Sequence, residues 1–331
     1  MSDKIVLVTD YTWPSTAPEA EVLARVGARL LVAETGSEEE LLRLVPGADA
    51  ILTCFKQVPV SVVRAGTKLQ VIGRYGIGVD NIPVDEATRL GIPVTNVPAY
   101  CLDEVAEHAL ALLLAGARSI VRYDRAVQKD NWSLATGMPV YRVVGRTLAI
   151  IGFGKIGRTL ARKAAALDLQ LLAHDPWVPD AEIRAAGVEP AGLDEALARA
   201  DFVSLHTPLT EETQHLLNAE RLARIKPGAF VINTARGALI DQEALLAALQ
   251  SGRVSGAGLD VFVPEHLPPD HPLLAQPGVI ATPHTAFYSE ESVLELERLA
   301  AQNVADILSG RRPADVVNPE VLALERWSHL V

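Results

Sequence analysis

The chain has few cysteines, few aromatic residues and no long uninterrupted apolar run. Only Cys54 and Cys101 occur among its 331 residues, and they lack the Cys-x-x-Cys spacing of a zinc cluster or redox motif. Two cysteines cannot build a disulfide framework. Apolar stretches such as ALALLLAGA fall well short of the ~20 residues that a membrane-spanning helix requires. These absences exclude a disulfide-rich scaffold, and no membrane association is expected.

Basic clusters are also missing. The net charge is -11 and is spread along the chain, so nucleic acid is not an expected partner. The first residues, MSDKIVLVTD, contain too short an apolar run for a signal peptide, and a cytoplasmic protein is therefore expected. With 49% hydrophobic and 21% charged residues, the composition is that of a globular protein long enough for two domains.

Short apolar runs alternate with helix-like stretches along most of the chain. KIVLV, RLLVA, DAILT and LQVIG form a first series, and a second series runs from TLAII to GVIATP. This alternation predicts an α/β fold with parallel sheets. Between the two series we expect one buried connecting helix from Leu102 to about Tyr123. A last helix over 289–308 has no strand after it and is a candidate to pack back on the first segment.

The second series opens with a glycine motif. TLAIIGFGKIG has Gly-x-Gly-x-x-Gly spacing between an apolar strand and a helix, which is the setting of a dinucleotide-binding loop. Asp175 ends the next strand, where a carboxylate can accept hydrogen bonds from both ribose hydroxyls. It would repel a 2'-phosphate, so NAD is predicted rather than NADP. The alternative is a glycine-rich turn of an ordinary βα unit. The predicted cofactor loop comprises Gly152, Phe153, Gly154, Lys155, Ile156 and Gly157.

Three polar residues follow three later strands of the second series. Arg236 comes after AFVINTA, Glu265 after SGAGLDVF and His284 after GVIATP. Ligands of open parallel sheets bind beyond the carboxyl ends of the strands, so the three side chains could share a site. Hydride transfer at a 2-hydroxy acid needs a base for the hydroxyl proton, a cation for the carboxylate and a group that orients the base. His284, Arg236 and Glu265 supply these roles in that order.

Each of the three residues also has a simpler interpretation taken singly: a surface ion pair, a solvated loop residue or a strand-end histidine. A metal site formed by Glu265, His266, Asp270 and His271 is a further alternative, because these residue types suit zinc. The segment is rich in proline and has no helical i, i+4 ligand pair, so no metal is predicted.

Several motifs together resemble the D-isomer-specific 2-hydroxyacid dehydrogenase family. They are RYGIGVDNI, DEVAEHALALLLA, IGFGKIG, KPGAFVINTARGALID, GLDVF and TPHTA, and they span nearly the whole chain. The resemblance implies a flavodoxin-like substrate-binding domain of residues 1–100 and 289–331, with an NAD-binding Rossmann domain of residues 101–288 inserted into it. It also implies catalysis between the two domains and a homodimer held by the NAD domains, with the helix near 103–118 in the interface.

The family pattern also assigns roles to residues that the spacing alone did not single out. It implies that Asp260 binds the nicotinamide carboxamide, and that the backbone amides of Ile77 and Gly78 hold the substrate carboxylate together with Arg236. Further residues expected beside the cofactor are Thr207, Pro208, Thr213, Thr234 and Ala235.

The variable end of the substrate is expected to meet residues on which the family differs. PHTAFYSEES is most similar to the corepressor-like branch, which has a tryptophan where Phe287 stands. That branch also carries an arginine at the position of Arg74, which is either a substrate contact or a structural residue. Phe55 and Lys56 follow a strand and are candidates for contacting the substrate, although a loop lysine is often only solvated. Glu265 argues against a formate dehydrogenase, and Ile77 stands where phosphite dehydrogenases carry lysine.

Two functions remain open at this point. The first is an NAD-dependent dehydrogenase or reductase of a small 2-hydroxy or 2-oxo acid. The alternative is an NADH-sensing, corepressor-like binding protein that uses the same fold. The chain has no long tails beyond its predicted elements, which favours the enzyme. Neither the acid nor the direction of the reaction can be read from the sequence.

Overall fold

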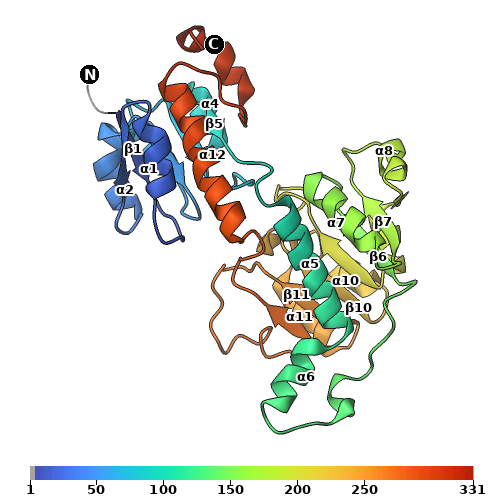
Figure 1. Cartoon of the computed structure of the whole chain (residues 1–331). Helices are drawn as coiled ribbons and strands as arrows, with labels where there is room; N and C mark the ends of the chain where they lie inside the picture. The colour runs from blue at the N-terminus through green and yellow to red at the C-terminus, as the bar shows by residue number, and fades with distance from the viewer. Residues whose placement is uncertain (1–3, 331) are drawn as a thin grey trace. The chain divides into compact units, whose positions relative to one another are not determined.

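The computed structural model describes residues 4–330, which divide into two compact units. Unit 1 comprises Met1–Tyr100 together with Ser289–Val331, and unit 2 is Cys101–Tyr288. Each unit contains one parallel β-sheet with helices packed on both faces (Figure 1). The predicted fold class, two doubly wound α/β domains with one inserted into the other, is confirmed.

Unit 1 contains a five-stranded parallel sheet in the order β2-β1-β3-β4-β5. This order, 2-1-3-4-5, is that of flavodoxin-like folds. The inner strands β3 and β4 are fully buried, as expected for a parallel sheet covered on both faces. The strands are β1 (Lys4–Val8), β2 (Ala28–Val32), β3 (Ala50–Thr53), β4 (Val71–Arg74) and β5 (Val94–Thr95).

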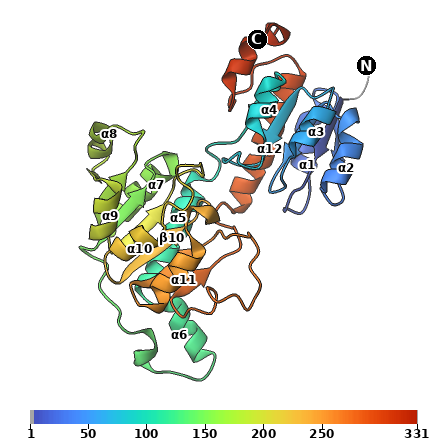
Figure 2. The same ribbon diagram turned by 180° about the vertical axis from the view of Figure 1, so that it is seen from behind.

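The helices of unit 1 form two layers. α2, α3 and α4 share one apolar core with the sheet, while α1 and α12 lie side by side on the opposite face (Figures 1 and 2). Helix α12 is thus part of the first unit, because its buried side packs on β3, β4 and β5. The helices are α1 (Ala17–Ala24), α2 (Glu38–Leu44), α3 (Val60–Ala65), α4 (Val84–Arg89) and α12 (Glu290–Leu308), with 3-10 turns η1 (Val45–Gly47), η4 (Pro319–Ala323) and η5 (Glu325–Trp327).

Unit 2 contains a seven-stranded parallel sheet in the order β12-β11-β10-β9-β6-β7-β8. Counted within the unit this is the Rossmann order 3-2-1-4-5-6 with a seventh strand at the edge. The strands are β6 (Thr147–Ile151), β7 (Gln170–His174), β8 (Glu189–Pro190), β9 (Phe202–Leu205), β10 (Ala229–Asn233), β11 (Val254–Leu259) and β12 (Val279–Ala281).

Two apolar cores flank this sheet. In β6, Leu148 and Ile150 face the core under α5 and α7, whereas Ala149 and Ile151 face the core under α9, α10 and α11 (Figure 2). Alternation of this kind follows from the two-residue period of a strand. The helices are α5 (Leu102–Ala117), α6 (Ile120–Val127), α7 (Lys155–Ala165), α8 (Asp180–Ala185), α9 (Leu193–Arg199), α10 (Ala219–Arg224) and α11 (Gln242–Gln250), with 3-10 turns η2 (Leu134–Gly137) and η3 (Gly237–Leu239).

The predicted single helix from Leu102 to about Tyr123 is wrong. Ser119 adopts left-handed backbone angles with φ 51°, and its hydroxyl donates to the carbonyl of Gly137 at 2.8 Å. A residue in this conformation ends a helix. The chain therefore turns between α5 and α6, and Ile120 is exposed rather than buried.

No helix within residues 4–330 is both long enough and apolar enough to cross a membrane.

Candidate active site

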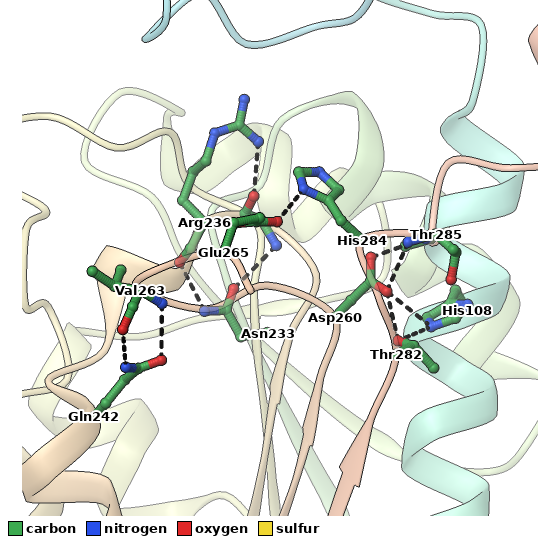
Figure 3. Close-up of polar contacts among 12 residues, drawn as sticks. His108, Asn233, Arg236, Gln242, Asp260, Val263, Glu265, Thr282, His284 and Thr285 are labelled. Atoms are coloured by element: carbon green, nitrogen blue, oxygen red, sulfur yellow. Dashed lines mark hydrogen bonds and ion pairs between the residues drawn. The ribbon is translucent and has the colours of Figure 1, made fainter. Parts of the chain in front are cut away.

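Arg236, Glu265 and His284 lie in the loops that follow β10, β11 and β12, which are adjacent strands of the unit 2 sheet. Because all three strands are parallel, their carboxyl ends meet at one edge. Figure 3 shows Glu265 between the side chains of Arg236 and His284 at this edge. The structure thus brings together the three residues that the sequence singled out.

His284 is held by both its side chain and its backbone. Nδ1 of the imidazole forms a short hydrogen bond with Oε1 of Glu265 (Figure 3). The imidazole is 24% exposed and Glu265 52% exposed. His284 has a left-handed φ of 55°, and the Phe287 ring stands edge-on to it with ring centroids 6.3 Å apart. The imidazole is therefore oriented and accessible.

A tight turn after β10 presents Arg236. The buried Asn233 side chain accepts from the amide of Ala235 at 3.0 Å and donates to the carbonyl of Arg236 at 2.8 Å. A Cβ at Gly237 would lie 2.4 Å from the backbone of Phe262, so only glycine allows this turn to pack on the loop after β11. This close packing brings the loops of Arg236 and Glu265 together.

Asp260 anchors the loop that carries His284. Its carboxylate is fully buried and accepts from the amides of Thr285 and Ala286, each at 2.9 Å, and from the hydroxyl of Thr282 (Figure 3). Its backbone carbonyl accepts from the amide of His284 at 2.8 Å. The predicted contact of Asp260 with the nicotinamide stays a prediction, and within the chain its carboxylate fixes the loop after β12.

In the glycine loop of unit 2, Gly152 and Gly157 lie against neighbouring backbone atoms. Gly152 has φ +96°, and a Cβ there would lie 2.5 Å from the carbonyl oxygen of His206. A Cβ at Gly157 would lie 2.2 Å from the carbonyl oxygen of Gly152, so α7 packs directly on the turn. A Cβ at Gly154 would meet nothing within 4 Å, which leaves open space at the helix N-terminus where a pyrophosphate is favoured.

Asp175 is tied to the glycine loop. Its carboxylate accepts from the amide of Phe153 at 2.7 Å and from the amide of Trp177 at 2.9 Å. These two bonds orient the carboxylate at the end of β7 and leave further acceptor positions for ribose hydroxyls. The residues present therefore fit the ribose and pyrophosphate of a dinucleotide.

The loops after β9 and β10 contain further residues that are predicted to contact the cofactor. Thr207 follows His206 beside Gly152, and the Thr213 hydroxyl donates to the carbonyl of Pro208 at 2.7 Å. Thr234 is buried, and its hydroxyl oxygen has no hydrogen-bond partner within residues 4–330. A buried unpaired hydroxyl is costly, and a bound cofactor would supply the missing partner.

His206 is a residue that the sequence reasoning missed. Its Nε2 lies 2.7 Å from the hydroxyl of Ser204 at the end of β9. Burial lowers the pKa of His206 to about 4, so its imidazole is neutral at neutral pH.

In unit 1, the loop after β4 contains the predicted carboxylate-binding amides. Arg74 is buried, and its guanidinium donates to Asn81 at 3.0 Å and to the carbonyl of Tyr75. These bonds give Arg74 a structural role in its own loop, so its contact with substrate stays a prediction. The amides of Ile77 and Gly78 donate to no other group of the described chain, which leaves them available for an anion.

The loop after β3 is also organised by a residue that the sequence reasoning missed. Asp10 accepts from three successive amides, those of Cys54, Phe55 and Lys56, at 2.7 to 3.1 Å. The side chains of Phe55 and Lys56 are exposed. Only the position of Asp10 two residues after the end of β1 could have indicated this role.

No three His, Cys, Asp or Glu side chains within the described part of the chain are grouped so that they could hold a metal ion.

Comparison with known proteins identifies the family. The model of the D-isomer specific 2-hydroxyacid dehydrogenase NAD-binding domain matches residues 110–286. A glyoxylate reductase from Korarchaeum cryptofilum is 40% identical over 290 residues, which are 86% of this chain and 87% of the relative. A D-3-phosphoglycerate dehydrogenase from Mycobacterium bovis is 38% identical over 96% of this chain and 59% of the relative. The crystal structure of an Aquifex aeolicus D-lactate dehydrogenase with NAD and lactic acid has a TM-score of 0.85 and 28% identity, covering 97% of this chain and 98% of that one.

The chain belongs to the D-isomer specific 2-hydroxyacid dehydrogenase family. It is an NAD-dependent oxidoreductase that acts on the CH–OH group of 2-hydroxy acids. The predicted enzyme class and cofactor are confirmed. The alternative of a corepressor-like binding protein finds no support among these relatives.

Proposed function

We propose that His284, Glu265 and Arg236 carry the reaction in this chain, and that its substrate is a small 2-oxo or 2-hydroxy acid. The observation that carries the proposal is the bond between His284 Nδ1 and Glu265, with Arg236 on the adjacent loop. This arrangement combines a proton donor, a group that orients it and a cation for a carboxylate.

The glycine loop and Asp175 would hold NADH, which would supply a hydride for C2 of a 2-oxo acid. His284 donates the Nε2 proton to the carbonyl oxygen as the hydroxyl forms, and it accepts that proton back in the reverse reaction. Glu265 accepts from Nδ1 and stabilises the imidazole in its charged form. Arg236 binds the substrate carboxylate, and its charge favours the negative charge that grows on the carbonyl oxygen.

The same proposal covers the residues that bind cofactor and substrate. The glycine loop of residues 152–157 and Asp175 bind the pyrophosphate and the adenine ribose, and Asp260 contacts the nicotinamide. In unit 1, the amides of Ile77 and Gly78 bind the substrate carboxylate. The further cofactor contacts proposed are Thr207, Pro208, Thr213, Thr234 and Ala235, and the further substrate contacts are Arg74, Phe55, Lys56 and Phe287.

A panel of 2-oxo acids tests the proposed substrate class. We expect the protein to oxidise NADH with one or more of glyoxylate, hydroxypyruvate, pyruvate and phenylpyruvate. The oxidation is measured as a loss of the NADH absorbance at 340 nm. Glyoxylate comes first, because a relative with 40% identity is named a glyoxylate reductase. NADPH should be used much less well, because the Asp175 carboxylate repels a 2'-phosphate. Tight NADH binding without turnover of any of these acids would contradict the proposal.

We also propose a homodimer formed through unit 2. The segment from α6 to β6 exposes a set of large apolar side chains, and such a patch is typical of an interface. Light scattering should give about twice the chain mass of 35.5 kDa. Replacing Trp132 and Leu134 by aspartate should yield monomers, whereas Leu42→Asp on α2 should not. A monomeric wild-type protein would contradict the proposal. The exposed apolar residues are Ile120, Val127, Trp132, Leu134, Met138, Tyr141 and Val144.

A cytoplasmic location remains a proposal from the sequence. Fractionation of cells followed by immunoblotting would test it.

A further inference from the structure

His108 is a half-buried polar residue of helix α5, and it lies beside the loop after β12. Its Nε2 is 3.0 Å from the hydroxyl oxygen of Thr282 and 3.7 Å from Oδ1 of Asp260 (Figure 3). The imidazole is 23% exposed. No role in the reaction described above requires this histidine, so its position calls for a separate explanation.

A continuous chain of hydrogen bonds leads from His108 to the loop of His284. The Thr282 hydroxyl donates to Oδ1 of Asp260, and the Asp260 carboxylate accepts from the amides of Thr285 and Ala286. The Asp260 carbonyl accepts from the amide of His284 itself. Asp260 therefore holds the backbone on both sides of the left-handed His284, and His108 holds the threonine that completes the Asp260 contacts.

The carboxylate of Asp260 fixes the direction of these hydrogen bonds. A carboxylate only accepts, so the single proton of the Thr282 hydroxyl goes to Asp260, and the Thr282 oxygen then accepts from the Nε2–H of His108. Asp260 is fully buried, and Nε2 of His108 lies 3.7 Å from Oδ1 of its carboxylate. A buried carboxylate is costly unless its hydrogen bonds are complete, so losing the His108 donor loosens the Asp260 anchor.

We propose that His108 is a positioning residue for hydride transfer: through Thr282 and Asp260 it fixes the backbone that presents His284. It touches neither substrate nor cofactor in this role. The inference rests on the proposed function, because it matters only if His284 is the proton donor.

Two substitutions of His108 test the proposal. Leucine removes the donor at similar volume, and glutamine restores an N–H donor. We expect His108→Leu to lower kcat by about 10- to 100-fold, since a lost bond in a buried charged network has an effect of that order. The KM for the 2-oxo acid and the Kd of ADP-ribose, which lacks the nicotinamide, should change by less than about threefold. His108→Gln should recover most of the lost kcat.

The controls separate this inference from the proposed function. His329→Leu, an exposed histidine in unit 1, should retain full kcat. If His284→Ala retains full kcat, the proposed function fails and the inference fails with it. If His284→Ala loses kcat while His108→Leu retains it, only the inference is overturned. Equal losses of kcat and ADP-ribose binding in His108→Leu, without recovery in His108→Gln, would mean a merely structural role and would also overturn it.

Discussion

Replacing His284 by alanine is expected to lower kcat for 2-oxo acid reduction by about 10²–10⁴-fold, the usual contribution of a positioned acid or base. The imidazole is the group that the bond from Nδ1 to Glu265 orients, and its side chain is partly exposed. The Kd of NADH, measured by fluorescence titration, should stay within about twofold, because the glycine loop and Asp175 lie on other strands of the sheet. Steady-state kinetics with the best acid of the panel provide the measurement.

Glu265→Gln is expected to lower kcat less than His284→Ala does. Glutamine can still accept a hydrogen bond from Nδ1 but cannot balance a charged imidazole, so a kcat reduced by about 10- to 100-fold is expected from the loss of a charge-assisted bond. His329→Ala is the matched control, because this histidine is exposed and lies in unit 1. Unchanged kcat in His284→Ala would rule out the proposed acid and base.

The second large effect concerns the stability of unit 1. Glu19 of α1 is fully buried, and its Oε1 accepts from the indole of Trp13 at 3.2 Å and the hydroxyl of Tyr75 at 3.1 Å. Glu297 of α12, also buried, lies against it. Burial raises the pKa of Glu19, and burial together with the neighbouring Glu19 raises the pKa of Glu297 to about 8. Arg298 offsets this only in part.

These raised pKa values make stability depend on pH. Both carboxyls return to an ordinary pKa of 4.5 on unfolding, so between about pH 4.5 and 8 the native state holds more protons than the unfolded state. Stability therefore falls as the pH rises through this range and is greatest below it. Since one pKa unit corresponds to about 1.4 kcal/mol, the loss is on the order of a few kcal/mol.

Glu297→Gln should remove much of this dependence. The variant is expected to keep its Tm between pH 6 and 9, where that of the wild type falls by roughly 5 °C. Circular dichroism melts across this range give the comparison. Glu295→Gln on the same helix is the control, because its side chain is exposed. Parallel Tm curves for wild type and Glu297→Gln would show that the buried pair carries no such effect.

Most of the fold could be predicted from the sequence, because alternating apolar runs and glycine positions are local signals. The glycine loop, Asp175 and the three polar residues in the loops after β10, β11 and β12 can all be recognised in the sequence, because each lies in the segment that follows a predicted strand. Parallel strands then bring such residues to one edge without any further information. The end of α5 was not visible, since Ser119 is an unremarkable residue in a sequence of good helix formers, and its bond to Gly137 depends on tertiary structure.

Residues that position other residues could not be predicted either, because their contacts also depend on tertiary structure. His108 and Thr282 are 174 positions apart, and nothing in either local pattern indicates their contact. Asp10 and the loop of Cys54 are likewise joined only by the packing of β1 against β3. A polar side chain on the apolar stripe of a helix is the one signal that could have drawn attention to His108.

The two hydrogen bonds that the Asp175 carboxylate accepts would restrict a change of coenzyme from NADH to NADPH. A single substitution that removes the carboxylate to admit a 2'-phosphate also removes the acceptor for two amides, those of Phe153 and Trp177. The glycine loop would lose this hydrogen-bonded support in the same step. A laboratory lineage selected for NADPH should therefore acquire compensating changes near Phe153 before or together with the loss of Asp175, and single-step variants should bind both coenzymes poorly.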